Sequence, residues 1–468
     1  MRRRTAVAVA LATAAAAVWP DVASAHGLVG RADLPIPSWL FGWGASIVLI
    51  VSFVALATLW PQPRLEQAVE RPWFRIPAWV DPICGLIGVA LFGVVVYSGL
   101  EGTSEAMNNF ASNFIFVEFW VGLVILSVLF GDVFRAFNPW LAVGRALRWA
   151  AARAGLSSPV RRDYPAWLGR WPAVATIIGF AWLELVYTQK TPQTLAWLCI
   201  GYAVVQLLAM AAFGIERWVD NGDGFTVYFN LFSRLSPLIR RDGVLHLRPP
   251  LAGVPSMPMV PGSIGLLCAA IGSTTFDGFS NGPVWASLNP DLQSLFKDLG
   301  SSTNVAIELA GAVGLLGCVA AVGLFYRLGV RGMQTVGEGY PSTELARRFA
   351  HTLVPIAFAY ALAHYFSLLI YNGQAVASLV SDPLGDGSNI FGTASAHIDY
   401  GVISGKGIWY VQVAALVVGH VSGLILAHDR ALSLYKRVRD ATRSQYWMLV
   451  VMVGFTSLGL WLLSAVRQ

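Results

Sequence analysis

Charged residues are scarce in this chain. Only 12% of its 468 residues are Asp, Glu, Lys or Arg, about half the share found in an ordinary soluble domain, whereas 56% are apolar. The mean hydropathy is +0.60. These values indicate a polytopic membrane protein whose main partner is the lipid bilayer. The net charge of +6 gives no reason to expect a nucleic acid as a partner, because the positions of the basic residues explain it.

Sequence motifs of several enzyme and cofactor classes are also missing. The four cysteines lie inside apolar stretches and form no Cys-x-x-Cys pair, which argues against a disulfide scaffold or a zinc knuckle. The chain contains no His-x-His, no His-Glu-x-x-His, no haem-attachment Cys-x-x-Cys-His and no Walker A motif. Any metal or catalytic site must therefore be assembled from residues that are distant in sequence.

The first 25 residues are typical of a secretory signal peptide. Three arginines follow Met1, an apolar stretch extends over residues 5–18, and Ala23-Ser24-Ala25 forms a small-residue cleavage site. Cleavage there would make His26 the first residue of the mature chain, and its amine and imidazole together can chelate copper. We therefore expect a signal peptide at 1–25 and a single transmembrane helical domain at 26–468.

Ten apolar segments of about twenty residues predict an all-α bundle of about ten transmembrane helices. They lie near 39–60, 79–100, 112–134, 171–189, 192–213, 261–281, 303–326, 348–371, 408–428 and 446–465. With the mature N-terminus outside, the connections that are predicted to be cytoplasmic hold 24 Lys and Arg residues, and the outer side holds five. This imbalance predicts a multi-pass protein of the cell membrane with both termini extracytoplasmic.

Three connecting segments are predicted to be more than loops. Residues 140–154 alternate apolar residues with Arg at helical spacing and are expected to lie on the inner membrane surface. Residues 224–239 are apolar but too short to span, so they too are expected at the interface. Asn289 is a predicted N-cap for a short outer helix at 290–299, which is expected to cover an outward-facing cavity.

Titratable groups inside the predicted spans are the main functional signal, because such groups are costly in a membrane unless they are paired. Six of them come from different helices, and all except His420 lie near the outer third of their spans. They are Glu118, Glu184, Asp277, Glu308, His364 and His420. Tyr360, His364, Ser367 and Tyr371 also share one helical stripe. These residues predict one outward-facing polar site. The bland alternative is that each polar group bonds a local partner and fixes helix packing; Gly419 and Gly423 around His420 are typical of such close packing.

Three chemistries suit this set of residues. Imidazole and carboxylate groups can ligate a divalent metal, which would activate water and polarise a phosphoryl oxygen. Without metal, the same groups can relay protons or cations. Two histidines on facing helices can instead ligate haem.

The chain resembles an actinobacterial family of polytopic membrane proteins named fenitrothion hydrolase. The resemblance covers nearly the whole chain and rests on residues 25–56, 131–146, 272–279, 351–369, 381–393 and 409–432. The name implies cleavage of an aryl P–O bond in an organophosphorothioate triester, and it implies no particular catalytic residues.

Two functions of different classes follow from these observations. The first is a membrane-embedded hydrolase that acts on phosphoester-like or apolar small molecules at the outer leaflet. Its six titratable groups would bind a divalent metal or serve as base, and Tyr360 or Tyr371 would steady a phosphoryl oxygen. The second is a transporter or copper-handling protein that uses the same cluster as a coupling or ligand site. The shortage of titratable groups in the inner halves of the spans slightly favours the first.

Overall fold

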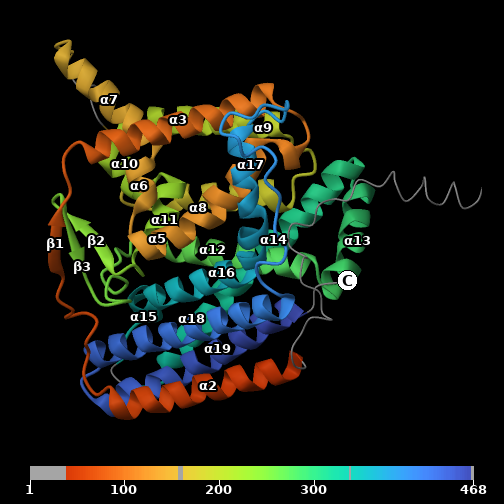
Figure 1. Cartoon of the computed structure of the whole chain (residues 1–468). Coiled ribbons are helices and arrows are strands. Elements are labelled where there is room, and N and C mark those ends of the chain that lie inside the picture. Colours follow the sequence, from red (N-terminus) through yellow and green to blue (C-terminus); the bar gives the residue numbers. More distant parts are fainter. Residues whose placement is uncertain (1–37, 157–161, 337–338, 465–468) are drawn as a thin grey trace, which may run out of the picture.

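Long helices lie side by side across the molecule (Figure 1). The structure is a computed structural model, and it describes residues 38–156, 162–336 and 339–464. The first half contains α2 (Ser38–Leu59), β1 (Arg71–Arg75), α3 (Val80–Glu101), η2 (Ala106–Asn108), α4 (Phe110–Asn113), the π-helical segment η3 (Phe114–Gly122), α5 (Leu123–Phe130), α6 (Val133–Phe137), α7 (Pro139–Arg153), α8 (Trp171–Leu185), α9 (Pro192–Phe213), α10 (Ile215–Asn221) and α11 (Gly224–Ser233). The second half contains β2 (Leu238–Arg241), β3 (Val244–Leu247), α12 (Ser263–Ser280), α13 (Pro283–Asp298), α14 (Thr303–Met333), α15 (Ser342–Phe349), η4 (Ala350–Thr352), α16 (Leu353–Asn372), η5 (Gly373–Ala375), α17 (Val376–Ser381), α18 (Gly405–Leu434) and α19 (Val438–Ser464). The predicted signal peptide and His26 lie outside the described residues.

The prediction of an all-α fold is confirmed, since each of the ten predicted spans overlaps a helix. Within the described residues, seven helical segments are long and apolar enough to cross a membrane, which is compatible with a multi-pass membrane protein. They are Gly42–Leu59, Val80–Glu101, Phe110–Phe130, Pro192–Phe213, Thr303–Met333, Ser342–Ser381 and Gly405–Leu434. The number of ten spans stays a prediction: α8 has only 15 residues, fewer than the roughly 20 that a bilayer requires.

The connections collect at two opposite ends of the bundle, as alternating spans require. The three strands and α15 lie at one end, and α13 and α17 lie toward the other (Figure 1). The first group belongs to the connections predicted to face the cytoplasm, and the second group to those predicted to face outward. We therefore call these the inner and the outer end of the bundle.

A small antiparallel sheet at the inner end was not predicted. Its strand order is β1-β3-β2, and it joins residues from the first connection to a hairpin after α11. Arg240 forms an ion pair with Asp81 at the start of α3, and Arg241 pairs with Glu70 just before β1. The hydrogen bonds and charge of Arg241 hold the pKa of the Glu70 carboxyl below its usual range. The sheet therefore fastens two segments that are far apart in sequence.

Helix α12 is the central helix of the bundle. Nearly every residue from Leu266 to Gly278 is buried, whereas a surface helix would bury only one stripe. It packs against α8, α14, α16 and α19. Gly272 makes one of these contacts especially close, because a Cβ at this position would lie 2.6 Å from the Cα of Val319 on α14. The polar residues of α12 are therefore surrounded by other helices.

The placement of residues 224–239 at a membrane interface was wrong. Helix α11 is buried within the bundle against α5, α8 and α16. Its N-cap, Asp223, is fully buried and accepts hydrogen bonds from Asn138, Trp140, Tyr202 and Thr226 at 2.6–2.9 Å. These donors satisfy a carboxylate that the apolar surroundings would otherwise destabilise.

The predicted start of the outer helix at Asn289 was also wrong. Helix α13 begins at Pro283 after the N-cap Gly282, and Pro290 lies inside it. Proline is favoured in the first turn of a helix, and Pro283, rather than Pro290, is the proline that occupies this position. The helix ends at Asp298, close to the predicted end, and it packs on α14. Whether it covers a cavity stays a prediction.

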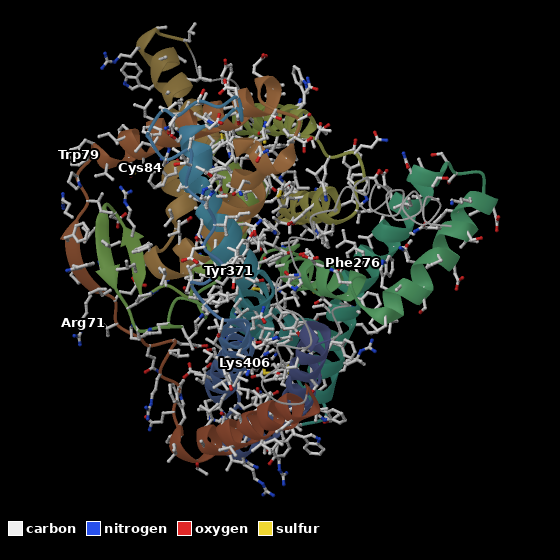
Figure 2. All side chains as sticks on the ribbon, turned by 45° about the vertical axis from the view of Figure 1, so that its right-hand side comes forward. Arg71, Trp79, Cys84, Phe276, Tyr371 and Lys406 are labelled. Carbon is white, nitrogen blue, oxygen red and sulfur yellow. The ribbon has the colours of Figure 1, made fainter. Side chains whose placement is uncertain are left out.

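Large apolar side chains are exposed along several long helices. Ile47 and Val51 on α2, Leu86 on α3 and Leu208 on α9 are 56–69% exposed. Figure 2 shows Trp79 at the edge of the molecule and the buried Tyr371 in its middle. An outer surface of this kind is unfavourable in water and suits lipid.

Helices α16 and α18 pack closely at glycine, as the sequence predicts. A Cβ on Gly419 would lie 2.2 Å from the Cβ of Ala359 and 2.8 Å from the carbonyl oxygen of Pro355. A Cβ on Gly423, one turn later, would lie 3.1 Å from the carbonyl oxygen of Thr352. The two helix backbones can approach only because both positions lack a side chain.

We predict that Gly419→Ala destabilises the protein, because its methyl group collides with backbone atoms that cannot move independently. The expected loss is about 1–3 kcal/mol in the free energy of unfolding. Gly317→Ala is the matched control, since a Cβ there meets nothing within 4 Å. Thermal unfolding of both variants in detergent measures the difference, and equal midpoints would contradict this packing.

Candidate functional site

An acid and a histidine from two different helices meet inside the bundle. The Nε2 atom of His364 on α16 lies 3.0 Å from the Oδ2 atom of Asp277 on α12. The side chain of Asp277 is 2% exposed and that of His364 is 12% exposed. Both residues belong to the predicted site, and their contact confirms that these two spans bring their polar groups together.

Glu184 and two tyrosines surround this pair. Glu184 lies at the end of α8, is 8% exposed, and interacts electrostatically with Asp277 and with Lys190. The hydroxyl of Tyr365 donates a hydrogen bond to Asp277. Tyr228, on the buried helix α11, interacts electrostatically with Glu184. Glu184, Asp277, His364 and Tyr365 are called the acid–histidine cluster below.

The acid–histidine cluster contains more acid than base. Two carboxylates lie near each other in apolar surroundings, where like charges repel strongly. The Oε2 atom of Glu184 is buried and has no hydrogen-bond partner among the described residues. A proton bound between the two acids, or a positive charge on His364, relieves this repulsion. The arrangement can therefore hold, accept and release protons.

Glu118 has a partner of its own. It lies on the π-helical segment η3, and the side-chain amide of Asn113 donates to its two carboxylate oxygens at 2.9 and 3.1 Å. The two residues are five positions apart, which is the hydrogen-bond spacing of a π-helix, so the local widening of the helix brings them together. Segment η3 packs on α16, the helix that carries His364.

Glu308 is held near the surface at the outer end. Its carboxylate accepts hydrogen bonds from the backbone N–H and the hydroxyl of Thr188, at 3.3 and 2.9 Å. Thr188 follows α8, the helix that carries Glu184. Glu308 therefore fastens the loop after α8 to α14.

His420, Tyr360 and Tyr371 each bind a backbone carbonyl. The Nδ1 atom of His420 lies 2.7 Å from the carbonyl oxygen of Leu416, its ring lies against Tyr360, and its Nε2 atom is buried without a hydrogen-bond partner among the described residues. The hydroxyl of Tyr360 donates to Phe455 on α19 at 2.7 Å. Tyr371 donates to Ile403 at 3.0 Å, just before α18. These contacts join α16 to α18 and α19, so the three residues fit a packing role.

The prediction that all six titratable groups converge was therefore only partly right. Asp277, His364 and Glu184 come together, while Glu118, Glu308 and His420 have local partners. The described residues hold no group of three or more His, Cys, Asp or Glu side chains that could bind a metal ion. The predicted metal set of His364, His420, Glu118, Glu184, Asp277 and Glu308 is thus not assembled. The four cysteines are free.

A Gly-x-Ser-x-Gly pattern at 278–282, directly after Asp277, is the sequence signal that the prediction of the site did not use. In the nucleophile elbow, this serine lies on a sharp turn from a strand to a helix. Here Ser280 ends helix α12, and its hydroxyl donates to the backbone carbonyl of Asp277 at 2.8 Å. The pattern therefore closes a helix and does not form an elbow.

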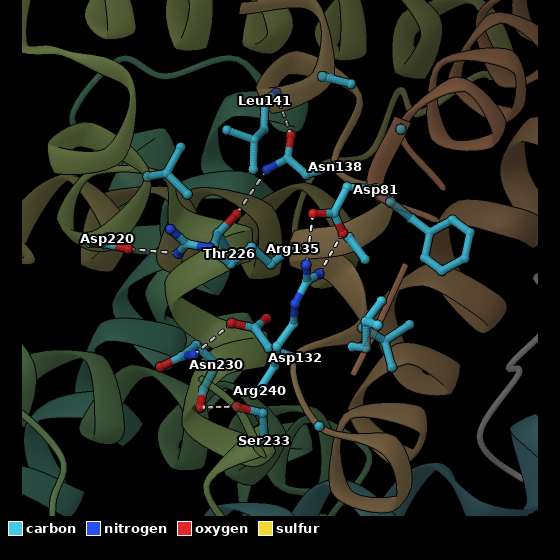
Figure 3. A pocket seen from close by; sticks show the side chains of 18 of the residues that line it. Asp81, Asp132, Arg135, Asn138, Leu141, Asp220, Thr226, Asn230, Ser233 and Arg240 are labelled. Carbon is cyan, nitrogen blue, oxygen red and sulfur yellow. Dashed lines mark hydrogen bonds and ion pairs between the residues drawn. The ribbon is translucent and has the colours of Figure 1, made fainter. Parts of the chain in front are cut away.

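A cavity of about 1700 Å³ opens at the inner end of the bundle, and none of the residues of the acid–histidine cluster lines it. Figure 3 shows two ion pairs in its wall, Arg240 with Asp81 and Arg135 with Asp220. Thr226, Asn230 and Ser233 of α11 also line it. The same buried helix thus borders the cavity with one set of side chains and approaches Glu184 with Tyr228.

Comparison of the chain with protein-family models, with curated proteins and with solved structures found no match. The site must therefore be interpreted from its own chemistry.

We predict that His364→Ala lowers stability, because it removes a direct partner of a buried carboxylate. Breaking a buried ion pair on one side costs about 3–5 kcal/mol, and the contact with Tyr365 should reduce this value. Glu308→Gln is the control and should change stability by less than about 0.5 kcal/mol, because that side chain is partly exposed. Thermal unfolding in detergent measures the stability of both variants. A larger loss of stability for Glu308→Gln than for His364→Ala would contradict this prediction.

Proposed function

We propose that this chain is a multi-pass protein of the cell membrane that exchanges protons at the acid–histidine cluster and moves them across the membrane, alone or together with a solute. The observation that carries the proposal is the 3.0 Å contact of His364 with Asp277, beside the buried acid Glu184. Ionisable groups at such positions in membrane proteins are typical of proton relays.

The short buried helices support a transporter. Helices α10 and α11 have seven and ten residues, and Gly222 and Asp223 separate them. Interrupted helices inside a membrane bundle are typical of transporter sites, where they place polar groups at mid-depth. Helix α11 lies between the cluster, through Tyr228, and the inner cavity, through Asn230 and Ser233. A movement of α11 would alter the surroundings of the acid–histidine cluster and the shape of the inner cavity.

The proposed orientation follows the distribution of basic residues. Both termini would be extracytoplasmic, the acid–histidine cluster would lie in the outer half, and the cavity would open toward the cytoplasm. Protons would then enter the cluster from the outer side, past Lys190, which donates a hydrogen bond to the carbonyl oxygen of Glu184.

A second candidate is the hydrolase that the sequence resemblance implies. The His364–Asp277 contact is its supporting observation, since an imidazole that a carboxylate orients is a common general base. Such a hydrolase would act on phosphoester-type small molecules with water as the nucleophile, because the hydroxyl of Ser280 is bonded to a backbone carbonyl. It would require access for the substrate to a pair that is largely buried.

We predict that vesicles containing the protein take up protons faster than empty vesicles when a pH gradient is imposed and the membrane potential is clamped. Asp277→Asn should reduce the rate to that of empty vesicles, because the neutral amide cannot exchange a proton with His364. Glu308→Gln should retain the wild-type rate. An internal pH-sensitive dye gives the measurement.

Equal rates for wild type and Asp277→Asn would reject proton exchange at this cluster. The hydrolase is distinguished in the same preparation by incubation with a nitrophenyl phosphotriester. Release of nitrophenol by wild type, and its loss in both Asp277→Asn and His364→Ala, would establish the second candidate in place of the first.

A further inference from the structure

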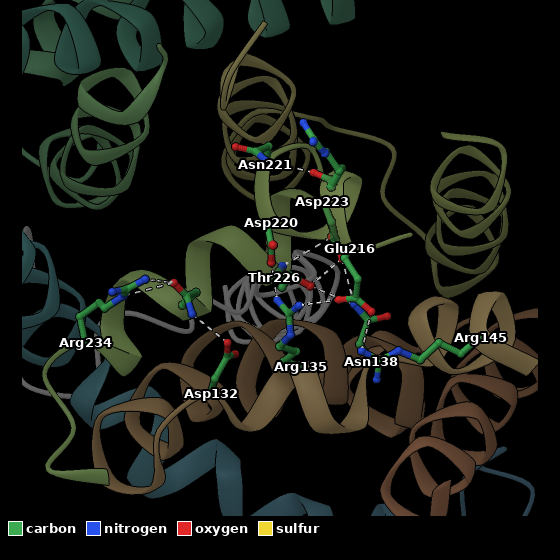
Figure 4. A network of polar contacts seen from close by, with 12 residues as sticks. Asp132, Arg135, Asn138, Arg145, Glu216, Asp220, Asn221, Asp223, Thr226 and Arg234 are labelled. Carbon is green, nitrogen blue, oxygen red and sulfur yellow. Dashed lines mark hydrogen bonds and ion pairs between the residues drawn. The ribbon is translucent and has the colours of Figure 1, made fainter. Parts of the chain in front are cut away.

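The inner cavity has an uneven charge distribution. Seven arginines and four aspartates line it. Four of the arginines are neutralised by ion pairs: Arg135 with Glu216 and Asp220, Arg145 with Glu216, Arg240 with Asp81, and Arg241 with Glu70. Figure 4 shows the network around Arg135 and Glu216. Arg170, Arg234 and Arg248 have no carboxylate within ion-pair distance in the part of the chain that the structure describes.

These three arginines come from separate segments. Arg170 precedes α8, Arg234 follows α11, and Arg248 follows β3. Arg170 and Arg248 are 5% and 6% exposed. The Nε atom of Arg170 and the Nη1 atom of Arg248 are buried without a hydrogen-bond partner among the described residues. The rest of the Arg170 guanidinium group has one contact, from Nη1 to the hydroxyl of Ser263 at 3.3 Å. An unsatisfied N–H on a buried guanidinium group is costly, so a further acceptor is expected to compensate it.

The three charges also act on one another. Burial and the charge of Arg234 lower the pKa of Arg170 to about 10, and the same two causes lower that of Arg248 to about 10. Both groups are still positively charged at neutral pH. Arg234 therefore repels both Arg170 and Arg248 at this cavity. The charges of Asp132, Asp220 and Glu70 offset this repulsion only in part, and an anion placed among the three arginines would relieve the rest.

Arg248 has a structural role in addition. It donates to the carbonyl oxygens of Ser233, Arg234 and Ser236, which lie at and beyond the end of α11. These bonds satisfy carbonyl groups at a helix C-terminus. Arg234, by contrast, makes hydrogen-bond contacts only of 3.4 Å, with Asn230 and Ser256, which are long. The carboxylate of Asp132, to which Asn230 also donates, attracts Arg234 without forming an ion pair with it. Arg234 is therefore the arginine that is most readily available to a ligand.

We propose that Arg170, Arg234 and Arg248 form a binding site for a phosphoryl anion at the inner end of the bundle. The planar guanidinium group suits the oxygens of phosphate, and arginine is favoured wherever such groups are bound. The phosphoryl group belongs either to a lipid headgroup or to a water-soluble phosphate compound. The site is separate from the acid–histidine cluster and does not depend on proton exchange there.

The test uses the full-length protein, purified in a nonionic detergent. Inorganic phosphate and a short-chain phosphatidic acid are titrated separately, with short-chain phosphatidylcholine as the zwitterionic lipid control, and the thermal unfolding midpoint is followed. At least one of the two anionic probes should raise the midpoint of the wild type. If inorganic phosphate raises the unfolding midpoint, the ligand is a water-soluble phosphate compound. If phosphatidic acid raises the midpoint and phosphate does not, the ligand is a lipid headgroup.

Arg234→Gln should weaken binding of the active probe about tenfold or more, because it removes one charge-assisted contact. Without a probe, this variant should unfold at the wild-type midpoint or above it, since one repulsive charge is gone; a purely structural arginine would show the opposite. Arg331→Gln is the matched control, an exposed arginine at the inner end that does not line the cavity, and it should keep its affinity within about twofold.

Arg170→Gln provides a second variant with the same expected loss of binding. The proposal is overturned if neither anionic probe shifts the wild-type midpoint, if phosphatidylcholine shifts it equally, or if Arg331→Gln weakens binding as much as Arg234→Gln.

Discussion

The structure depends on the neutralisation of charged side chains within an apolar bundle. A buried carboxylate is tolerated only when donors or opposite charges surround it. Asp223 satisfies this condition through four side-chain donors, and Asp429 on α18 through Trp60 and the backbone N–H groups of residues 64 and 65. Both acids fasten segments that are distant in sequence, and their bonds are saturated.

The acid–histidine cluster differs from these saturated acids. Asp277 meets an imidazole and a phenol, and Glu184 keeps an unbonded oxygen next to it. The donors to Asp223 hold a helix cap and distant segments in place, whereas Asp277 contacts an imidazole and a phenol, two groups that can themselves carry or donate a proton. This contrast within one molecule is the physical reason to assign function to the cluster and structure to Asp223.

Much of the fold could be predicted from the sequence, because long apolar segments indicate where the long helices of the bundle lie. The close packing around Gly419 was also predictable, since small residues one turn apart mark such contacts. The burial of α11 was not, because the donors that satisfy Asp223 include Trp140 and Tyr202, far away along the chain. Taken on their own, residues 224–239 form only an apolar segment that is too short to span a membrane.

The site was half predictable for a related reason. Sequence position gives the depth of a residue along its helix axis, and depth correctly grouped Asp277, Glu184 and His364. It does not give the direction in which a side chain points around that axis. Glu118 and Glu308 have similar depths, yet Asn113 and Thr188 hold them locally. A metal site needs several ligands that point to one spot, which depth alone cannot predict.

Infrared difference spectroscopy of the membrane-reconstituted protein tests the central claim most directly, because it detects the C=O vibration of a protonated carboxyl group. Spectra recorded as the pH is lowered should contain a buried carboxyl band that disappears in Asp277→Asn, shifts or disappears in Glu184→Gln, and persists in Glu308→Gln. A titrating band that is unchanged in Asp277→Asn and Glu184→Gln, or no buried carboxyl band at any pH, would contradict proton exchange at the acid–histidine cluster.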